Sequence, residues 1–168
     1  RDAASLAECR RIHARAPLRL TADLAFGFAD ELRGATEGSQ AATQPTVAIT
    51  VAPGNFPATR PADEFLSELR LAIGGLVNRG WQIVLLPFQI SHVLGGAPDD
   101  AAWLLRLFDS LPPAQRAAVE HRSIAANAAS IASAFRGVDV LCGMRYHGHV
   151  IASMMGRPFV GLAHDRKI

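Results

Sequence analysis

The sequence lacks the marks of several common protein classes. Its two cysteines, Cys9 and Cys142, lie far apart and neither has a second cysteine nearby, which argues against a metal knuckle and a secreted disulfide framework. No set of histidines, cysteines and carboxylates has metal-ligand spacing, so we expect no metal site. The net charge is only +2 and 49% of the residues are apolar, which argues against a disordered protein and a protein that coats nucleic acid.

Long apolar runs are also missing. The run over residues 81–86 is cut by Pro87, Gln89 and His92 before it reaches the roughly 18 to 20 residues that a membrane-spanning helix requires. We therefore expect no transmembrane segment, and the cysteine pattern favours a reducing, cytoplasmic setting. The sequence starts at Arg1 without a methionine or an apolar leader, so we expect it to be cut from a longer protein.

Small and polar residues dominate residues 34–45, GATEGSQAATQP, which is the composition of a linker or an exposed loop. Before this stretch, residues 4–12 suit a helix and residues 18–22 alternate like a strand that ends at Asp23. That strand has no neighbouring sheet to join. We therefore place a domain boundary within the small, polar stretch.

Beyond the boundary, apolar stretches alternate with amphipathic ones. The predicted strands are TVAITVA, WQIVLLPF, VDVLCGM and PFVGLA. The predicted helices are PADEFLSELRLAIGGLVNRG, DDAAWLLRLFDSL, NAASIASAFRG and GHVIASMMG. Residues 112–124 are ambiguous, and they fit a turn of helix followed by a weak strand. Strands that are apolar on both faces and alternate with helices indicate an α/β fold, a Rossmann-like doubly wound parallel sheet.

The turn after VDVLCGM is the main candidate for a binding site, because ligands of such sheets bind at the carboxyl ends of strands. Free backbone N–H groups at the start of the next helix favour an anion, and Arg145 adds a planar fork for a carboxylate or phosphate. Gly143 and Gly148 would let a ligand approach the backbone, and His147 could donate to the anion or move a proton. His149 points either into solvent or into the core. The competing interpretation is that these residues are solvated surface groups.

Polar residues after three other strands are weaker candidates. Asn55 follows the first strand and Gln89 the second, so both could face the same cleft, although a polar loop also explains them. The tail AHDRKI follows the last strand: Asp165 could accept a hydrogen bond from a hydroxyl of a ligand or orient His147, and Lys167 could add charge. A solvated charged turn is the alternative. We expect Asp99 and Asp100 to cap a helix rather than to act as paired carboxylates.

The end of the chain resembles a known family. GMRYHGHVIASMMGRPFVGLAHDRKI is similar to the G-x-R-x-H, small-residue helix, G-x-P and x-D-x-K pattern that closes the polysaccharide pyruvyl transferase family. RDAASLAECRRIHARAPLRLTADLAF resembles the family's R-D-x-x-S helix and the strand after it, and VLLPFQ followed by PDD resembles its middle stretch. Two departures are Ala52 and Pro53, where relatives often have an arginine, and His164, where they often have a tyrosine.

The resemblance implies an architecture like that of two-domain GT-B glycosyltransferases. Residues 1–26 would be the tail of an N-terminal Rossmann-like domain that is mostly absent, residues 27–45 a linker, and residues 46–168 the C-terminal Rossmann-like domain. The resemblance also implies an enzyme that transfers a pyruvyl group from phosphoenolpyruvate to two hydroxyls of a cell-surface polysaccharide or its lipid-linked precursor, forming a ketal. Phosphoenolpyruvate would be a co-substrate, and no cofactor is expected. The protein would work in the cytoplasm or at the inner face of the membrane.

This reaction needs two neighbouring anions neutralised and a proton delivered to carbon, so we predict Arg145 as the anion clamp and His147 as a donor ligand or general acid. The predicted donor-binding set is Gly143, Arg145, His147, Gly148, Asp165 and Lys167. The residues predicted to face the cleft are Asn55, Gln89, His149 and His164. A GT-B glycosyltransferase that uses a nucleotide sugar and a non-catalytic anion-binding module stay open as alternatives. We expect the chain to be able to form a homodimer through the surface that the absent domain would cover, and it could be inactive alone.

Overall fold

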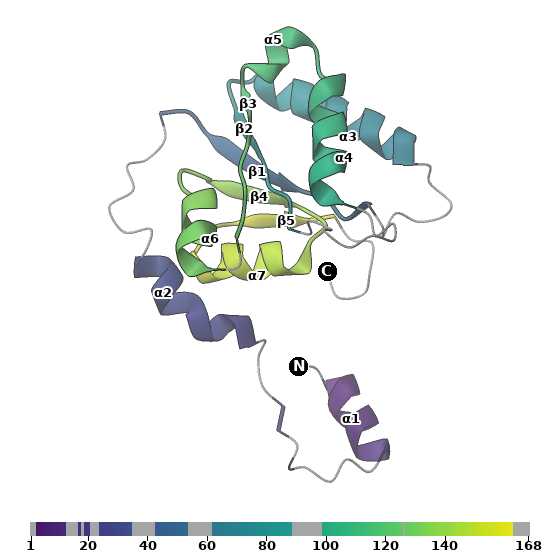
Figure 1. Ribbon diagram of the computed structural model, residues 1–168, viewed down its shortest axis with the longest axis vertical. Helices are drawn as coiled ribbons and strands as arrows, with labels where there is room; N and C mark the ends of the chain where they lie inside the picture. The colour runs from purple at the N-terminus through teal and green to yellow at the C-terminus, as the bar shows by residue number, and fades with distance from the viewer. Residues whose placement is uncertain are drawn as a thin grey trace.

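A five-stranded parallel sheet forms the centre of the computed structural model, which describes residues 3–12, 17, 19–20, 24–34, 43–53, 62–88, 99–125 and 127–162. The strands are β1 (Thr46–Thr50), β2 (Gln82–Leu85), β3 (Val119–His121), β4 (Val140–Gly143) and β5 (Phe159–Gly161). Their order is β3-β2-β1-β4-β5 and every neighbouring pair is parallel (Figure 1). This topology confirms the predicted α/β, doubly wound fold.

Helices cover both faces of the sheet. The helices that follow the strands are α3 (Ala62–Val77), α4 (Asp100–Ser110), α5 (Pro113–Arg116), α6 (Ala128–Ala134) and α7 (Tyr146–Met154). Helices α3 and α4 lie on one side of the strands and α6 and α7 on the other (Figure 1). Every residue of β1 is buried, which explains why this strand is apolar at successive positions rather than at alternate ones.

Two hydrophobic cores result from this layering. Val47 and Ile49 of β1 pack with the apolar faces of α3 and α4, whereas Ala48 between them packs with α6 and α7. Trp103 and Leu107 of α4 are buried in the first core. Among the described helices, none has the length and apolar character needed to cross a membrane.

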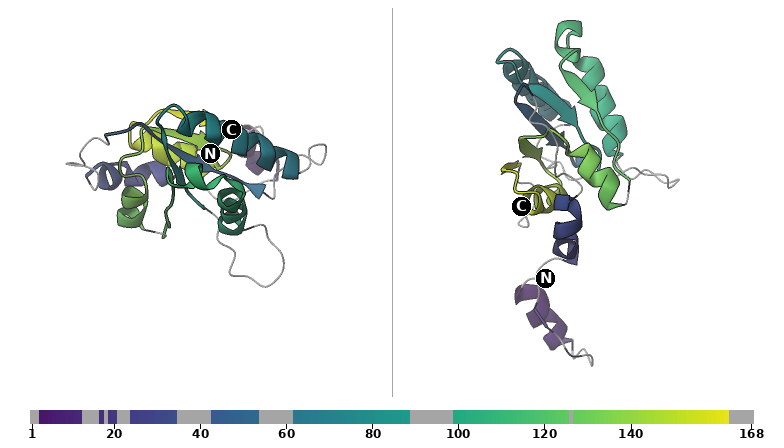
Figure 2. Two further views of the ribbon diagram at one scale, coloured as in Figure 1. Left: turned by 90° about the horizontal axis from the view of Figure 1, so that it is seen from above. Right: turned by 90° about the vertical axis from the view of Figure 1, so that its left-hand side faces the viewer.

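Part of the segment before the sheet packs against one of the two hydrophobic cores. Among the described residues before β1 are α1 (Ala3–Arg11), the 3-10 helix η1 (Leu24–Phe28) and α2 (Ala29–Gly34). Leu32 of α2 is 2% exposed and belongs to the core that α6 and α7 form, with Ala25 and Ala29 packed beside it. Figure 2 shows α2 beside the sheet domain. Burial of Leu32 is a tertiary contact that the local composition could not reveal.

The expected helix at residues 4–12 is present as α1, which buries no residue. The expected strand at residues 18–22 is not tested as a whole, because residues 18, 21 and 22 lie outside the described part of the chain; residues 19 and 20 belong to no strand. Helix α2 ends at Gly34, where the small, polar stretch starts, and residues 35–42 of that stretch lie outside the described part of the chain. The division of the chain into two domains and a linker stays a prediction.

Candidate functional site

The carboxyl ends of β1 and β4 meet where the strand order reverses. From β1 the chain moves outward on one side to β2 and β3, and it then returns to place β4 on the other side. Thr50 at the end of β1 pairs with Gly143 at the end of β4. In open parallel sheets such a switch point is the usual ligand site, because the loops that leave the two strands diverge and form a crevice. The turn predicted from the sequence as an anion site therefore lies at the expected place.

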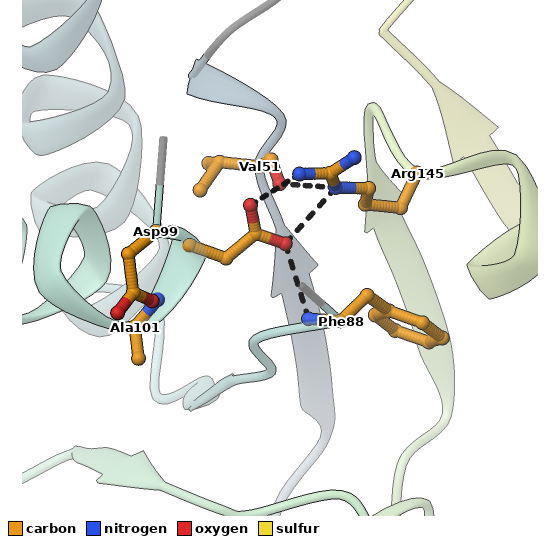
Figure 3. A network of polar contacts seen from close by, with 6 residues as sticks. Val51, Phe88, Asp99, Ala101 and Arg145 are labelled. Carbon is orange, nitrogen blue, oxygen red and sulfur yellow. Dashed lines mark hydrogen bonds and ion pairs between the residues drawn. The ribbon is translucent and has the colours of Figure 1, made fainter. Parts of the chain in front are cut away.

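Arg145 holds a buried carboxylate at this switch point. Its Nε donates to Oδ2 of Asp100 at 2.9 Å and to the carbonyl oxygen of Val51 at 3.1 Å, and its Nη2 pairs with Oδ1 of Asp100 (Figure 3). The backbone N–H of Phe88, beyond the end of β2, donates to the same Oδ2 at 3.1 Å. The Asp100 side chain is 0% exposed and that of Arg145 is 20% exposed. The contacts join the ends of β1, β2 and β4.

The ion pair with Asp100 uses the side edge of the Arg145 guanidinium. The terminal edge, which the two terminal nitrogens form, points in another direction. Both Arg145 nitrogens that bond to Asp100, Nε and Nη2, lie along the side edge. The remaining nitrogen, Nη1, lies on the side away from the carboxylate (Figure 3). Arg145 is also the N-cap residue of α7, but its side chain makes no capping hydrogen bond there. A ligand anion could thus use the terminal edge of Arg145 and the positive end of the helix dipole without breaking the ion pair.

His147 lies on a different surface from the Arg145 ion pair. It is exposed on the first turn of α7 and lines a cavity of about 440 Å³ between η1, α2, α6 and α7. The lining is mostly apolar and includes Phe28, Leu32, Phe88, Ile124, Asn127 and Ile151. Arg145 is not part of this lining, although Phe88 connects the two places through its backbone bond to Asp100. This geometry gives no support to joint binding of one anion by Arg145 and His147, and each residue's role stays a prediction.

The two glycines of the turn have packing partners within the protein. A Cβ at Gly143 would lie 1.9 Å from Oγ1 and 2.6 Å from the carbonyl oxygen of Thr50. A Cβ at Gly148 would lie 3.2 Å from Leu141 and 3.5 Å from the ring of Phe88. Both glycines are buried. Close packing therefore explains glycine at these positions, and the predicted approach of a ligand to their backbone is untested.

His149 is a core residue, which decides between the two orientations that the sequence left open. Its side chain is 6% exposed, its Nε2 lies 2.9 Å from the carbonyl oxygen of Gly143, and its ring stacks on Phe159 with 4.9 Å between centroids. Burial lowers the pKa of His149, and the hydrogen bond to the Gly143 carbonyl opposes that shift in part. His149 thus supports the turn from β4 into α7 from within the core.

Five predicted residues lie outside the described part of the chain: Asn55, Gln89, His164, Asp165 and Lys167. Sequence analysis missed Asp100, because both aspartates of the pair were expected to cap α4. Asp99 does cap it, with its side chain accepting from the N–H of Ala101 at 2.8 Å. The available signal was that one of two successive aspartates suffices as a cap, which leaves the other for a different partner.

Comparison with known proteins gives one match. A family model described as polysaccharide pyruvyl transferase matches residues 1–166, nearly the whole chain. No curated protein and no solved structure matches significantly. The family match confirms the resemblance found in the sequence motifs.

Proposed function

This chain belongs to the polysaccharide pyruvyl transferase family, and we propose that it binds the donor in an enzyme that transfers a pyruvyl group from phosphoenolpyruvate to two hydroxyls of a sugar. The acceptor would be a cell-surface polysaccharide or a lipid-linked precursor. The supporting observation is the position of Arg145, at the start of α7 and at the switch point of the sheet. In this proposal a second Rossmann-like domain, as in GT-B enzymes, closes over this edge and supplies the rest of the cleft.

The donor chemistry fits the charges at this edge. Phosphoenolpyruvate carries a carboxylate and a phosphate on a three-carbon skeleton, so its site must stabilise two anions close together. The terminal edge of Arg145 can bind one of them through two parallel hydrogen bonds, and the N-terminus of α7 favours negative charge beside it. Asp100 compensates part of the charge of Arg145, so the helix end is needed as well.

The transfer needs one proton delivered and two removed. A proton added to the methylene carbon turns it into a methyl group and leaves the neighbouring carbon electron-poor. The first sugar hydroxyl forms a C–O bond to that carbon, and the second forms another as phosphate leaves. Of the two hydroxyl protons, one balances the proton on the methyl group and the other leaves with hydrogen phosphate. We assign the proton delivery to His147, because an imidazole can donate a proton and this one is exposed on the first turn of α7, two residues after Arg145.

Isothermal titration of the chain with phosphoenolpyruvate tests the donor assignment. Arg145→Lys keeps a positive charge beside the buried Asp100 but removes the fork, so we expect it to bind phosphoenolpyruvate about tenfold or more weakly than the parent. The matched control is Arg106→Lys, since Arg106 forms an exposed ion pair with Asp63 on the surface of the domain. We expect this control to bind as the parent does.

Three results would contradict the proposal. Binding of a nucleoside diphosphate in place of phosphoenolpyruvate would favour a glycosyltransferase that uses a nucleotide sugar. Equal binding of phosphoenolpyruvate by Arg145→Lys and the parent would remove Arg145 from the donor site. If the protein bound the donor but formed no ketal with a sugar acceptor, the chain would be a non-catalytic anion-binding module.

A further inference from the structure

We propose that Asp100 is a positioning residue of the donor site: it holds Arg145 by the side edge so that the terminal edge of the guanidinium faces the donor anion. This inference rests on the proposed function and adds to it a residue and a binding direction. It starts from the pairing of the fully buried Asp100 carboxylate with Arg145 at the switch point of the sheet.

Asp100 and Val51 hold Arg145 along one edge of its guanidinium. Asp100 accepts from Nε and Nη2 of Arg145 and from the backbone N–H of Phe88, so its carboxylate is fixed both by a side chain and by the end of β2. The carbonyl oxygen of Val51 at the end of β1 fixes Nε a second time, at 3.1 Å. A guanidinium held by two partners along one edge cannot rotate without breaking several hydrogen bonds at once.

Asp100 is itself held in a well-defined place. It is the first residue of α4, where the helix dipole favours a carboxylate, and the preceding residue, Asp99, caps the helix. Trp103 and Leu104 anchor the same turn of α4 in the core, with 7% and 0% exposure. The direction of the Arg145 guanidinium is thus determined by a rigid helix and by two strand ends.

This arrangement has two opposite effects on an anion. Asp100 orients the terminal edge of Arg145, which lowers the entropic cost of forming a two-bonded contact with a carboxylate or phosphate. Asp100 also brings a negative charge close to the site, which repels the anion. If the orienting effect is larger, removal of the Asp100 charge weakens donor binding. If the repulsion is larger, the same change strengthens donor binding, so the direction of the change decides between the two effects.

Asp100→Asn is the deciding variant. It has nearly the same shape and lacks the negative charge, but its single carbonyl oxygen cannot replace a carboxylate that accepts from three donors. We expect it to bind phosphoenolpyruvate about tenfold or more weakly than the parent in isothermal titration. The matched control is Asp99→Asn, which makes the same change of charge one residue away and retains a good N-cap. We expect the control to stay within about twofold of the parent.

A second measurement reports on Arg145 without the donor. In ¹H–¹⁵N spectra the Nε–H signal of Arg145 can be assigned by its absence in Arg145→Lys. This signal should be protected from exchange with solvent in the parent and in Asp99→Asn, and the protection should be lost in Asp100→Asn. Donor binding by the double variant Asp100→Asn/Arg145→Lys should equal that of Arg145→Lys alone, because Asp100 acts through Arg145.

The outcomes separate this inference from the proposed function. Unchanged or tighter binding of phosphoenolpyruvate by Asp100→Asn would overturn the inference and leave the donor assignment standing, as would an Nε–H signal that persists in this variant. An equal loss in Asp99→Asn would also overturn it. A parent protein that binds no phosphoenolpyruvate would overturn the donor assignment, and the inference with it.

Discussion

Asp100 and Arg145 are 45 positions apart in the sequence, yet they form an ion pair inside the carboxyl edge of the sheet. Asp100 begins α4, which follows β2, and Arg145 precedes α7, which follows β4. Strand β1 lies between those two strands and contributes the carbonyl oxygen of Val51. The pair therefore crosses the switch point and links the two halves of the doubly wound sheet. It belongs to the fold as much as to the candidate site.

The first prediction concerns the stability of this pair. Arg145→Met leaves the fully buried carboxylate of Asp100 without its charged partner, so we expect the free energy of unfolding in urea to fall by about 3–5 kcal/mol. The double variant Arg145→Met/Asp100→Leu removes both charges, and we expect it to recover most of the loss. Arg106→Met is the control, because its ion pair with Asp63 is exposed and should be worth less than about 1 kcal/mol. A loss at Arg145 no larger than that at Arg106 would contradict the prediction.

Much of the fold could be predicted because it depends on local patterns. The runs that became β1 and β4 are apolar on both faces, as strands between two helical layers must be, and their positions also located the candidate site at the carboxyl edge. The partners of single side chains depend on contacts between distant segments. Asp100 contacts Arg145, which lies 45 positions away in the sequence, and Leu32 packs against residues of α6 and α7. Local patterns in the sequence do not reveal such contacts.

A second prediction tests the tight turn after β4. In Gly143→Ala the added methyl group would lie 1.9 Å from Oγ1 of Thr50 and 2.6 Å from its carbonyl oxygen, so the two strand ends must separate. We expect the free energy of unfolding to fall by about 1–3 kcal/mol. Thr50→Ala should rescue only part of the loss, because the carbonyl oxygen remains. Gly34→Ala is the control, since no heavy atom of the described residues beyond its chain neighbours lies within 4 Å of the position of its Cβ. Equal stability of the two alanine variants would refute this account.

A third prediction tests whether α2 belongs to the sheet domain. Leu32 is 2% exposed in the core formed with α6 and α7, so we expect Leu32→Ala to lower the free energy of unfolding by about 2–5 kcal/mol. Leu71→Ala is the control, because Leu71 is 69% exposed on α3 and its truncation should change stability by about 0.5 kcal/mol or less. Unfolding should remain a single transition in both variants. If Leu32→Ala behaved like Leu71→Ala, residues 29–34 would be a linker after all.

The last prediction follows from the buried imidazole of His149. Burial lowers the pKa of His149 below its ordinary value of about 6.5, so the unfolded chain binds more protons than the folded protein in the range between the two values. The neutral His149 therefore makes its full contribution to the free energy of unfolding above about pH 6.5. This contribution should fall as the pH drops below that value and should level off below the pKa of His149 in the folded protein. Urea titrations between about pH 7.5 and 5 would measure this slope.

His149→Phe should flatten that slope, because it keeps an aromatic ring against Phe159 but cannot be protonated. The Gly143 carbonyl that loses the imidazole still accepts from the N–H of Leu162 at 2.8 Å, so the variant leaves it with a partner. Burial also lowers the pKa of His121, although Asp109 opposes that shift, and this histidine contributes a slope of the same sign. His121→Gln is thus the matched control and should keep the part of the slope that belongs to His149. A slope in His149→Phe as steep as that of the parent would mean that the buried imidazole is not the group that titrates.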